Sequence, residues 1–258
     1  MKVSVIQYQP VFGNEQASIA ALGPLLNKAA GSDLVVLPEL AATGYNFENR
    51  EQAMRFAAEP EKSDFVKVLK SFCNTTGGIV VTGFNELSGN KIYNSALLID
   101  KNGIRNKYRK IQLFMREKEY FEAGDLQPEV IDVGGIKIGM LICFDWMFPE
   151  LWRKLALQGA DVICHPSNLV LPGKAQKAIP VHAMINRIFV ITANRTGIEK
   201  DLTFTGNSIM AAPSGKVIAE ASALRQEVIT AEIDISQARD KMITPLNHAY
   251  NDRRPEFY

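Results

Sequence analysis

The chain has 258 residues, of which 47% are hydrophobic and 22% charged, as in an ordinary globular protein. Its formal net charge of +1 provides no basic excess to bind nucleic acid or an anionic membrane, and no apolar run approaches the ~20 residues that span a bilayer. The few cysteines and histidines follow no disulfide or metal-ligand spacing; they are Cys73, Cys143, Cys164, His165, His182 and His248. We therefore expect a reducing, cytoplasmic location and no metal.

Strand and helix patterns alternate along the chain. Apolar alternation and short apolar runs predict strands at 2–9, 34–37, 78–84, 92–99, 104–108 and from 136 to the region of Cys143. Helices are predicted after the capping residues Asn14 and Ser63, from Pro149 to Gly159 and over 179–187. Gly23–Pro24 predicts a kink or restart in the first helix. Asn102–Gly103 and Gly134–Gly135 predict tight hairpins.

The second half of the sequence repeats the first. GSDLVVLPEL at 31–40 matches GADVICHPSN at 159–168, and the segment 92–103 matches 204–215. The helix at 179–187 and the strand after it mirror the helix after Ser63 and its following strand. Two such copies predict an α/β fold with two sheets packed face to face and helices outside, a four-layer αββα sandwich with a pseudo-twofold internal duplication. Because no linker separates the copies, we expect a single domain over 1–258.

Cys143 lies where a buried strand is predicted to turn into a helix. Backbone N–H groups and a helix dipole at such a turn favour the thiolate, which is the nucleophilic form. The alternative is that Cys143 only fills the core, as many buried cysteines do.

Glu39 and Lys110 are the other candidates for chemistry. Glu39 follows a buried strand, and its counterpart in the second copy is Ser167, so the fold does not require an acid there. Lys110 closes a basic run and precedes residues that turn inward. An ammonium group beside a thiolate and a carboxylate could stabilise an oxyanion. The alternatives are that Glu39 is a surface glutamate and that Lys110 lies at a solvated strand end.

Three separated motifs resemble those of the nitrilase (carbon–nitrogen hydrolase) superfamily. LPEL contains Glu39, YRKIQLF contains Lys110 and ICFDWMFPE contains Cys143, in the family's order. Later blocks such as NRIFVITANRTG also match. The resemblance implies the αββα sandwich, a homodimer or higher homo-oligomer, and catalysis without a metal or organic cofactor. It implies that Glu119 is the second active-site glutamate, since Glu122 fits the family's segment less well.

The resemblance implies a cysteine-dependent amidase with a Glu39–Lys110–Cys143 triad. Cys143 would form a thioester, Lys110 and the Phe144 backbone N–H would hold the oxyanion, and Glu39 would act as general base. Glu119 would orient Lys110 or the substrate nitrogen.

Phe144, Trp146, Asn168 and Tyr45 are predicted to line the substrate pocket. Trp146 and Met147 could instead belong to an interface, and Asn168 could be a turn asparagine. Cys143-Phe144-Asp145 resembles the amidase branches, and Met147 replaces the arginine of branches that bind carboxylate-bearing substrates. We therefore expect a small aliphatic amide, with nitriles and N-carbamoyl compounds as alternatives. A non-catalytic scaffold of the same fold is the alternative of a different class.

Overall fold

The computed structural model describes residues 1–257 and contains two six-stranded sheets. The first sheet has the spatial order β14 (Glu227–Glu232), β1 (Lys2–Gln7), β2 (Leu34–Val36), β3 (Ile79–Ser88), β4 (Lys91–Asp100) and β5 (Gly103–Arg109). The second has the order β6 (Ile131–Val133), β7 (Ile136–Met140), β8 (Val162–Ser167), β9 (Phe189–Asn194), β12 (Ile209–Ala211) and β13 (Val217–Glu220).

The two sheets have the same strand topology, which confirms the duplication predicted from the sequence. In each, three central strands run parallel, one antiparallel strand flanks them on one side and two flank them on the other. The flanking strand on the single-strand side is reached differently in the two sheets. β6 directly precedes its neighbour β7 in sequence, whereas β14 returns from near the end of the chain to pair with β1.

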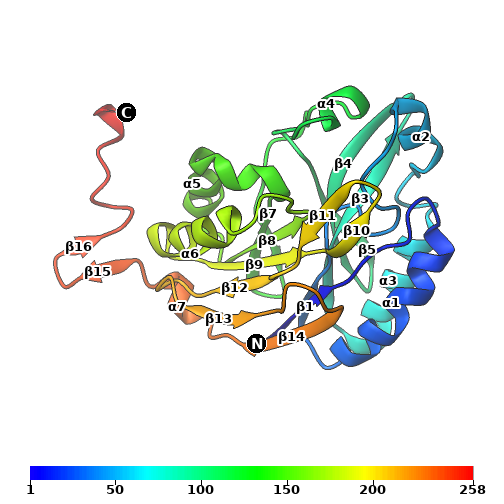
Figure 1. Cartoon of the computed structure of the whole chain (residues 1–258). Coiled ribbons are helices and arrows are strands. Elements are labelled where there is room, and N and C mark those ends of the chain that lie inside the picture. The colour runs from blue at the N-terminus through cyan, green and yellow to red at the C-terminus, as the bar shows by residue number, and fades with distance from the viewer. Residues whose placement is uncertain (258) are drawn as a thin grey trace.

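Two pairs of helices form the outer layers (Figure 1). Against the first sheet lie α1 (Glu15–Ala29) and α3 (Asp64–Thr76), and on the second lie α5 (Pro149–Leu157) and α6 (Lys174–Asn186). Leu22, Leu26 and Leu69 of the first pair share an apolar cluster with Val35 and Val80 of the first sheet. The sequence of layers is therefore helix, sheet, sheet, helix.

The main core lies between the two sheets. Val5 and Val81 of the first sheet belong to the same buried cluster as Met140 and Cys164 of the second. Strand alternation explains why Cys164 faces inward, because its neighbour His165 contacts Trp152 of α5 on the opposite face.

Helix starts follow the capping signals in the sequence. The Ala17 amide donates to Oδ1 of Asn14 at 3.0 Å and the Val66 amide donates to Oγ of Ser63 at 3.3 Å. Pro149 is the first residue of α5, as predicted. Of the kink or restart expected at Gly23–Pro24, the restart is wrong: α1 runs unbroken from Glu15 to Ala29, and its buried leucines pack on the sheet on both sides of Pro24.

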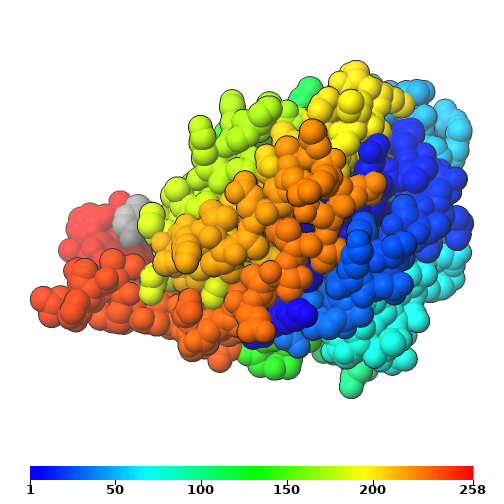
Figure 2. All heavy atoms as spheres, turned by 60° about the horizontal axis from the view of Figure 1, so that its bottom comes forward, coloured from blue at the N-terminus to red at the C-terminus, as the bar shows by residue number. Residues whose placement is uncertain are grey.

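Several shorter elements complete the chain. They are α2 (Arg50–Arg55), α4 (Glu117–Tyr120), a 3₁₀ turn η1 (Cys143–Met147), the hairpin β10 (Thr196–Glu199) and β11 (Leu202–Thr205), α7 (Ser236–Arg239), the hairpin β15 (Met242–Thr244) and β16 (Asn247–His248), and η2 (Pro255–Phe257). The last two form a tail that projects from one end of the body (Figure 2). No helix within residues 1–257 is long and apolar enough to cross a membrane.

Candidate active site

Glu39 reaches the interior because a glycine in the next strand leaves room for its backbone. The Gly83 amide of β3 donates to the Pro38 carbonyl at 3.0 Å, and the Ala41 amide donates to the Gly83 carbonyl at 3.2 Å. A Cβ on Gly83 would lie 2.3 Å from Cα of Glu39. The chain after β2 therefore packs directly on β3, and the Glu39 side chain is completely buried.

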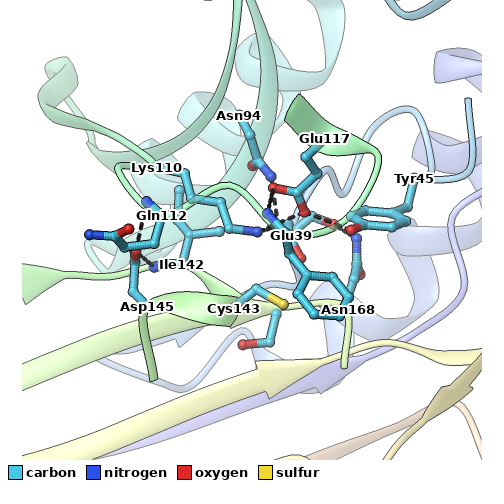
Figure 3. A network of polar contacts seen from close by, with 12 residues as sticks. Glu39, Tyr45, Asn94, Lys110, Gln112, Glu117, Ile142, Cys143, Asp145 and Asn168 are labelled. Carbon is cyan, nitrogen blue, oxygen red and sulfur yellow. Dashed lines mark hydrogen bonds and ion pairs between the residues drawn. The ribbon is translucent and has the colours of Figure 1, made fainter. Parts of the chain in front are cut away.

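Lys110 directly follows β5 and enters the same space. Its backbone amide donates to the Asn94 carbonyl at 2.8 Å, which holds it against β4. Its Nζ lies 2.7 Å from Oε1 of Glu39 and 2.8 Å from Oε1 of Glu117, and its side chain has no solvent exposure (Figure 3). The ammonium group thus bridges two buried carboxylates.

One oxygen of Glu39 is engaged and the other is free. Oε1 accepts a hydrogen bond from Asn94 Nδ2 at 2.6 Å as well as from Lys110. Oε2 is buried and has no hydrogen-bond partner among residues 1–257. Because a buried carboxylate oxygen without a partner is costly, this atom is set aside for a group that enters the site.

The second buried glutamate is Glu117, and the prediction of Glu119 is wrong. Glu119 is 61% exposed and pairs with Arg116 on the surface, while Glu122 pairs with Arg50 at a half-exposed position. Glu117 is buried, and besides Lys110 it accepts hydrogen bonds from the Tyr45 hydroxyl at 2.6 Å and the Phe114 amide at 3.2 Å.

A helical reading of this segment would have identified Glu117. The apolar residues Phe114, Tyr120 and Phe121 lie three and four positions from Glu117, which places its side chain on the inward face of α4. Glu119 lies on the opposite face.

Cys143 begins the tight turn η1 with a left-handed backbone, φ +42°. Asp145 braces this turn. Its Oδ2 accepts hydrogen bonds from the Ile142 amide and the Tyr108 hydroxyl, both at 2.8 Å, and its Oδ1 accepts one from the Gln112 amide at 3.3 Å (Figure 3). Asp145 is thus bonded to the segment that carries Lys110 as well as to the Cys143 turn.

Two histidines hold this turn from the helix side. Nε2 of His165 lies 2.9 Å from the Cys143 carbonyl oxygen, and Nε2 of His182 lies 2.9 Å from that of Trp146. Burial lowers the pKa of His165 to about 3, so the neutral ring donates its Nε2–H to the carbonyl. Both histidines therefore contribute to the structure of the turn.

The Cys143 thiol is protonated in the free site, contrary to the expectation of a thiolate. Burial raises the pKa of Cys143 well above its ordinary value, and the negative charge of Glu39 raises it further. Lys110 and the backbone amide of Asn168 oppose this shift without reversing it. The helix dipole does not help, since α5 begins only at Pro149, six residues beyond Cys143. A base must therefore remove the thiol proton when the cysteine reacts.

Lys110 remains a cation in the same environment. Burial would lower the pKa of Lys110, but Glu117 and Glu39 together raise it above its ordinary value. Burial raises the pKa of Glu117, and its contact with Lys110 opposes this. The site thus holds a fixed positive charge next to a neutral thiol.

Each predicted pocket residue lines one of two adjoining pockets. The pocket over Cys143 is small and is bounded by Phe114, Cys143, Phe144, Trp146, Asn168, Leu169, Val170 and Leu171. A second pocket shares Phe114 and Val170 with it and is lined by Tyr45 and Glu117 among others. Nδ2 of Asn168 also donates to the Glu39 carbonyl at 3.0 Å. Met147 instead is half exposed on the surface.

Comparison with known proteins decides the family. The chain matches the carbon-nitrogen hydrolase family over residues 2–241. It belongs to that family. The carbon-nitrogen hydrolase is 44% identical to a protein named nitrilase from Pyrococcus abyssi, over all of this chain and 99% of the relative. It is 32% identical to an (R)-stereoselective amidase from Pseudomonas sp., over 93% of this chain and 87% of the relative.

A solved structure has the same fold. The amidase from Nesterenkonia sp., determined as a double mutant in complex with acrylamide, superposes on this carbon-nitrogen hydrolase with a TM-score of 0.83. The two are 24% identical, and the match covers all of this chain and 95% of the other. The carbon-nitrogen hydrolase described here has no cluster of metal-ligating side chains within residues 1–257.

Proposed function

We propose that the protein is an amidase that cleaves small aliphatic amides to a carboxylate and ammonia through a thioester on Cys143. The observation that carries the proposal is the convergence of Lys110, Glu39 and Glu117 in one buried ion-pair cluster beside Cys143 (Figure 3). A structural protein gains little from such a group, because burying an ion pair rarely adds net stability.

The first half-reaction forms the acyl-enzyme. Oε2 of Glu39, the oxygen without a partner, takes the proton of Cys143 as the sulfur attacks the amide carbon. The tetrahedral oxyanion is stabilised by the Lys110 ammonium and the backbone N–H of Phe144. Collapse of this intermediate breaks the C–N bond, and Glu39 returns the proton to the leaving nitrogen, which departs as ammonia.

The second half-reaction releases the acid. Glu39 takes a proton from a water molecule, which attacks the thioester carbon, and the same cation and N–H stabilise the second oxyanion. The C–S bond breaks and the sulfur recovers a proton from Glu39. Glu117 takes the role that the sequence assigned to Glu119: it holds the Lys110 ammonium toward the substrate.

Small, uncharged acyl groups suit the pocket over Cys143. Its walls are aromatic and aliphatic apart from Asn168 and Cys143, and they include no charged side chain. Such walls favour a short aliphatic chain over a carboxylate, which would lose its hydration without gaining a partner. The acrylamide bound by the Nesterenkonia amidase is a small amide of this kind.

Nitrile hydrolysis is the second candidate, because the relative at 44% identity is named a nitrilase. The same nucleophile would attack a nitrile carbon, giving a thioimidate that water converts to a thioester with loss of ammonia. N-carbamoyl compounds, predicted as alternative substrates from the sequence, are the third substrate class.

Ammonia release from a panel of short aliphatic amides, matched nitriles and N-carbamoyl amino compounds tests the proposal. Amides should turn over fastest, Cys143→Ala should abolish turnover while its circular dichroism spectrum stays native, and mass spectrometry of quenched wild-type enzyme should detect an acyl group on Cys143. Full activity of Cys143→Ala on these substrates would exclude the mechanism, and faster turnover of nitriles would favour the second candidate.

We also propose that the whole chain acts as one catalytic unit in a homodimer. Exposed apolar side chains on α6, which include Val181, Met184 and Ile185, support a second copy as the partner of this face. The three cysteines of the chain are free and buried, which suits the reducing cytoplasm predicted from the sequence. Sedimentation velocity tests the dimer, and a monomer at micromolar concentration would contradict it.

A further inference from the structure

The β10–β11 hairpin interrupts the internal symmetry of the molecule. In the first half, a two-residue turn joins β3 to β4 directly, whereas the equivalent strands β9 and β12 are separated by residues 195–208. The hairpin, yellow in Figure 1, occupies most of this insertion. Since the sheets have matching topology without it, the insertion is not needed to form the sandwich.

The hairpin bonds to the loop that carries Tyr45. Oε1 of Glu199, the last residue of β10, accepts hydrogen bonds from the backbone amides of Tyr45 at 2.8 Å and Asn46 at 2.5 Å. The loop approaches so closely that a Cβ on Gly44, at φ +80°, would lie 2.5 Å from Oε2 of Glu199. Two charge-assisted hydrogen bonds to successive amides fix the position of the loop.

Arg195 holds the Glu199 carboxylate in place. Its Nη1 donates to Oε2 of Glu199 at 2.8 Å, and its guanidinium lies over the Phe204 ring at 3.9 Å. Arg195 is completely buried, yet its Nε and Nη2 have no hydrogen-bond partner among residues 1–257. A buried cation with donors left unpaired is a poor device for stability. Its position is better explained by what it holds.

Tyr45 connects this ion pair to the active site. Its ring packs edge-on against Phe204 at 6.0 Å, and its hydroxyl donates to Oε1 of Glu117 at 2.6 Å. The same oxygen of Glu117 accepts from Lys110 (Figure 3). An unbroken series of contacts therefore runs from Arg195 through Glu199 and Tyr45 to the buried glutamate.

We propose that Glu199, held by Arg195, is a positioning residue that fixes Tyr45 on Glu117 and thereby keeps Lys110 aimed at the reacting carbonyl. The inference rests on the proposed amidase function, in which Lys110 stabilises the oxyanion. Glu199 touches no reacting atom in this scheme. A shift of about 1 Å in a positioned catalytic group costs about a hundredfold in rate, so loss of this carboxylate is expected to act on kcat.

Glu199→Ala, Glu199→Gln and Tyr45→Phe test the proposal, with Thr203→Ala as a matched control on an exposed position of the same hairpin. We expect Glu199→Ala to lower kcat for the best amide by about tenfold to a hundredfold with KM changed less than threefold. Glu199→Gln keeps an acceptor oxygen and should recover most of that loss, and Thr203→Ala should match wild type.

A double-variant cycle separates positioning from general damage. If Glu199 acts through Tyr45, adding Glu199→Ala to Tyr45→Phe should lower kcat by less than threefold more. The rate at which iodoacetamide alkylates Cys143 is measured in parallel by mass spectrometry and should fall in the same order among the variants.

The results divide cleanly between the two proposals. A wild-type enzyme that hydrolyses no amide overturns the proposed function, while the alkylation rates still report on the position of the charged groups around Cys143. Kinetics of Glu199→Ala equal to those of Thr203→Ala, or losses that multiply fully in the double variant, overturn the positioning role. If Glu199→Ala fails to fold, Tyr45→Phe carries the test through the hydrogen bond to Glu117, and wild-type kcat and alkylation rate in Tyr45→Phe would also overturn the positioning role.

Discussion

The Nζ of Lys110 lies 2.8 Å from Oε1 of Glu117, and both side chains are buried. This oxygen also accepts the Tyr45 hydroxyl, while Lys110 donates a second time to Glu39. One cation thus faces two carboxylates. Burial raises the pKa of the neighbouring Cys143, and the two carboxylates raise it further while Lys110 opposes them.

Glu117 and Glu119 give a direct comparison of a buried and an exposed acid in one short helix. Glu117→Gln should lower kcat for the best amide by about a hundredfold, because Lys110 loses the charge that holds it. Glu119→Gln removes only a surface pair with Arg116 and should leave kcat within twofold of wild type. Steady-state ammonia release measures both. Equal losses in the two variants would contradict the assignment of Glu117.

Replacing Lys110 by methionine tests the buried cluster through stability. Lys110→Met leaves Glu39 and Glu117 facing each other without a cation, so we expect the free energy of unfolding at pH 8 to fall by about 3–5 kcal/mol. Without the cation, burial raises the pKa of Glu117 in the folded state with nothing to oppose it. The folded pKa of Glu117 then exceeds the unfolded one, and the variant should lose stability as pH rises from 5 to 8.

Guanidinium unfolding at pH 5 and pH 8 measures this effect. Lys107→Met is the matched control, because its partner Glu86 keeps two hydrogen bonds from Arg109. A pH dependence no steeper in Lys110→Met than in Lys107→Met would contradict the coupling of the buried carboxylates to Lys110.

The sequence contained the positions of the main reactive groups because they follow regular elements. Glu39 follows a strand predicted from a continuous apolar run, and Lys110 follows a strand predicted after a hairpin signal. Their chemical roles were predicted from the resemblance of their motifs to the family. The duplication likewise predicted two sheets built from repeated units, and the matching topology of the two sheets agrees with it.

Other features were not predicted from the sequence. The spacing of apolar residues around Glu117 identifies it as the buried glutamate only when the four-residue helix α4 is recognised, and no helix was predicted there. The protonated state of Cys143 results from burial by distant segments, which outweighs the local backbone effects visible in the sequence. The β10–β11 hairpin was not predicted, because its strands are short and its role is defined by contacts with residues about 150 positions away.

Asp145 makes stability depend on pH in a defined direction. Burial raises the pKa of Asp145 to about 7, against an ordinary value near 4 in the unfolded chain. Between these values the folded state binds more protons than the unfolded state, so the free energy of unfolding decreases as pH rises from 4 to 7. Three pKa units correspond to about 4 kcal/mol.

Asp145→Asn removes this titration and serves as the comparison. Its amide nitrogen must face a donor among Ile142, Tyr108 and Gln112, so we expect a loss of about 1–3 kcal/mol at pH 7. The difference in unfolding free energy between wild type and Asp145→Asn, measured at several pH values from 4 to 8, should shrink as pH rises. A constant difference across that range would show that Asp145 does not titrate there.

Gly83 tests whether the close approach of β3 is what places Glu39. In Gly83→Ala the new methyl carbon would lie 2.3 Å from Cα of Glu39, and the nearby atoms are backbone that cannot move aside cheaply. We expect the free energy of unfolding to fall by about 1–3 kcal/mol, as for an overpacked core. We also expect kcat to fall about a hundredfold as the Glu39 carboxylate shifts.

Gly23→Ala is the matched control, because nothing lies within 4 Å of a Cβ at this position. An alanine inside a helix should stabilise the protein by about 0.5–1 kcal/mol, with kcat unchanged. Thermal unfolding and amide turnover of both variants decide the matter. A Gly83→Ala enzyme with wild-type kcat would mean that the close contact between Gly83 and the backbone of Glu39 does not determine the position of the base.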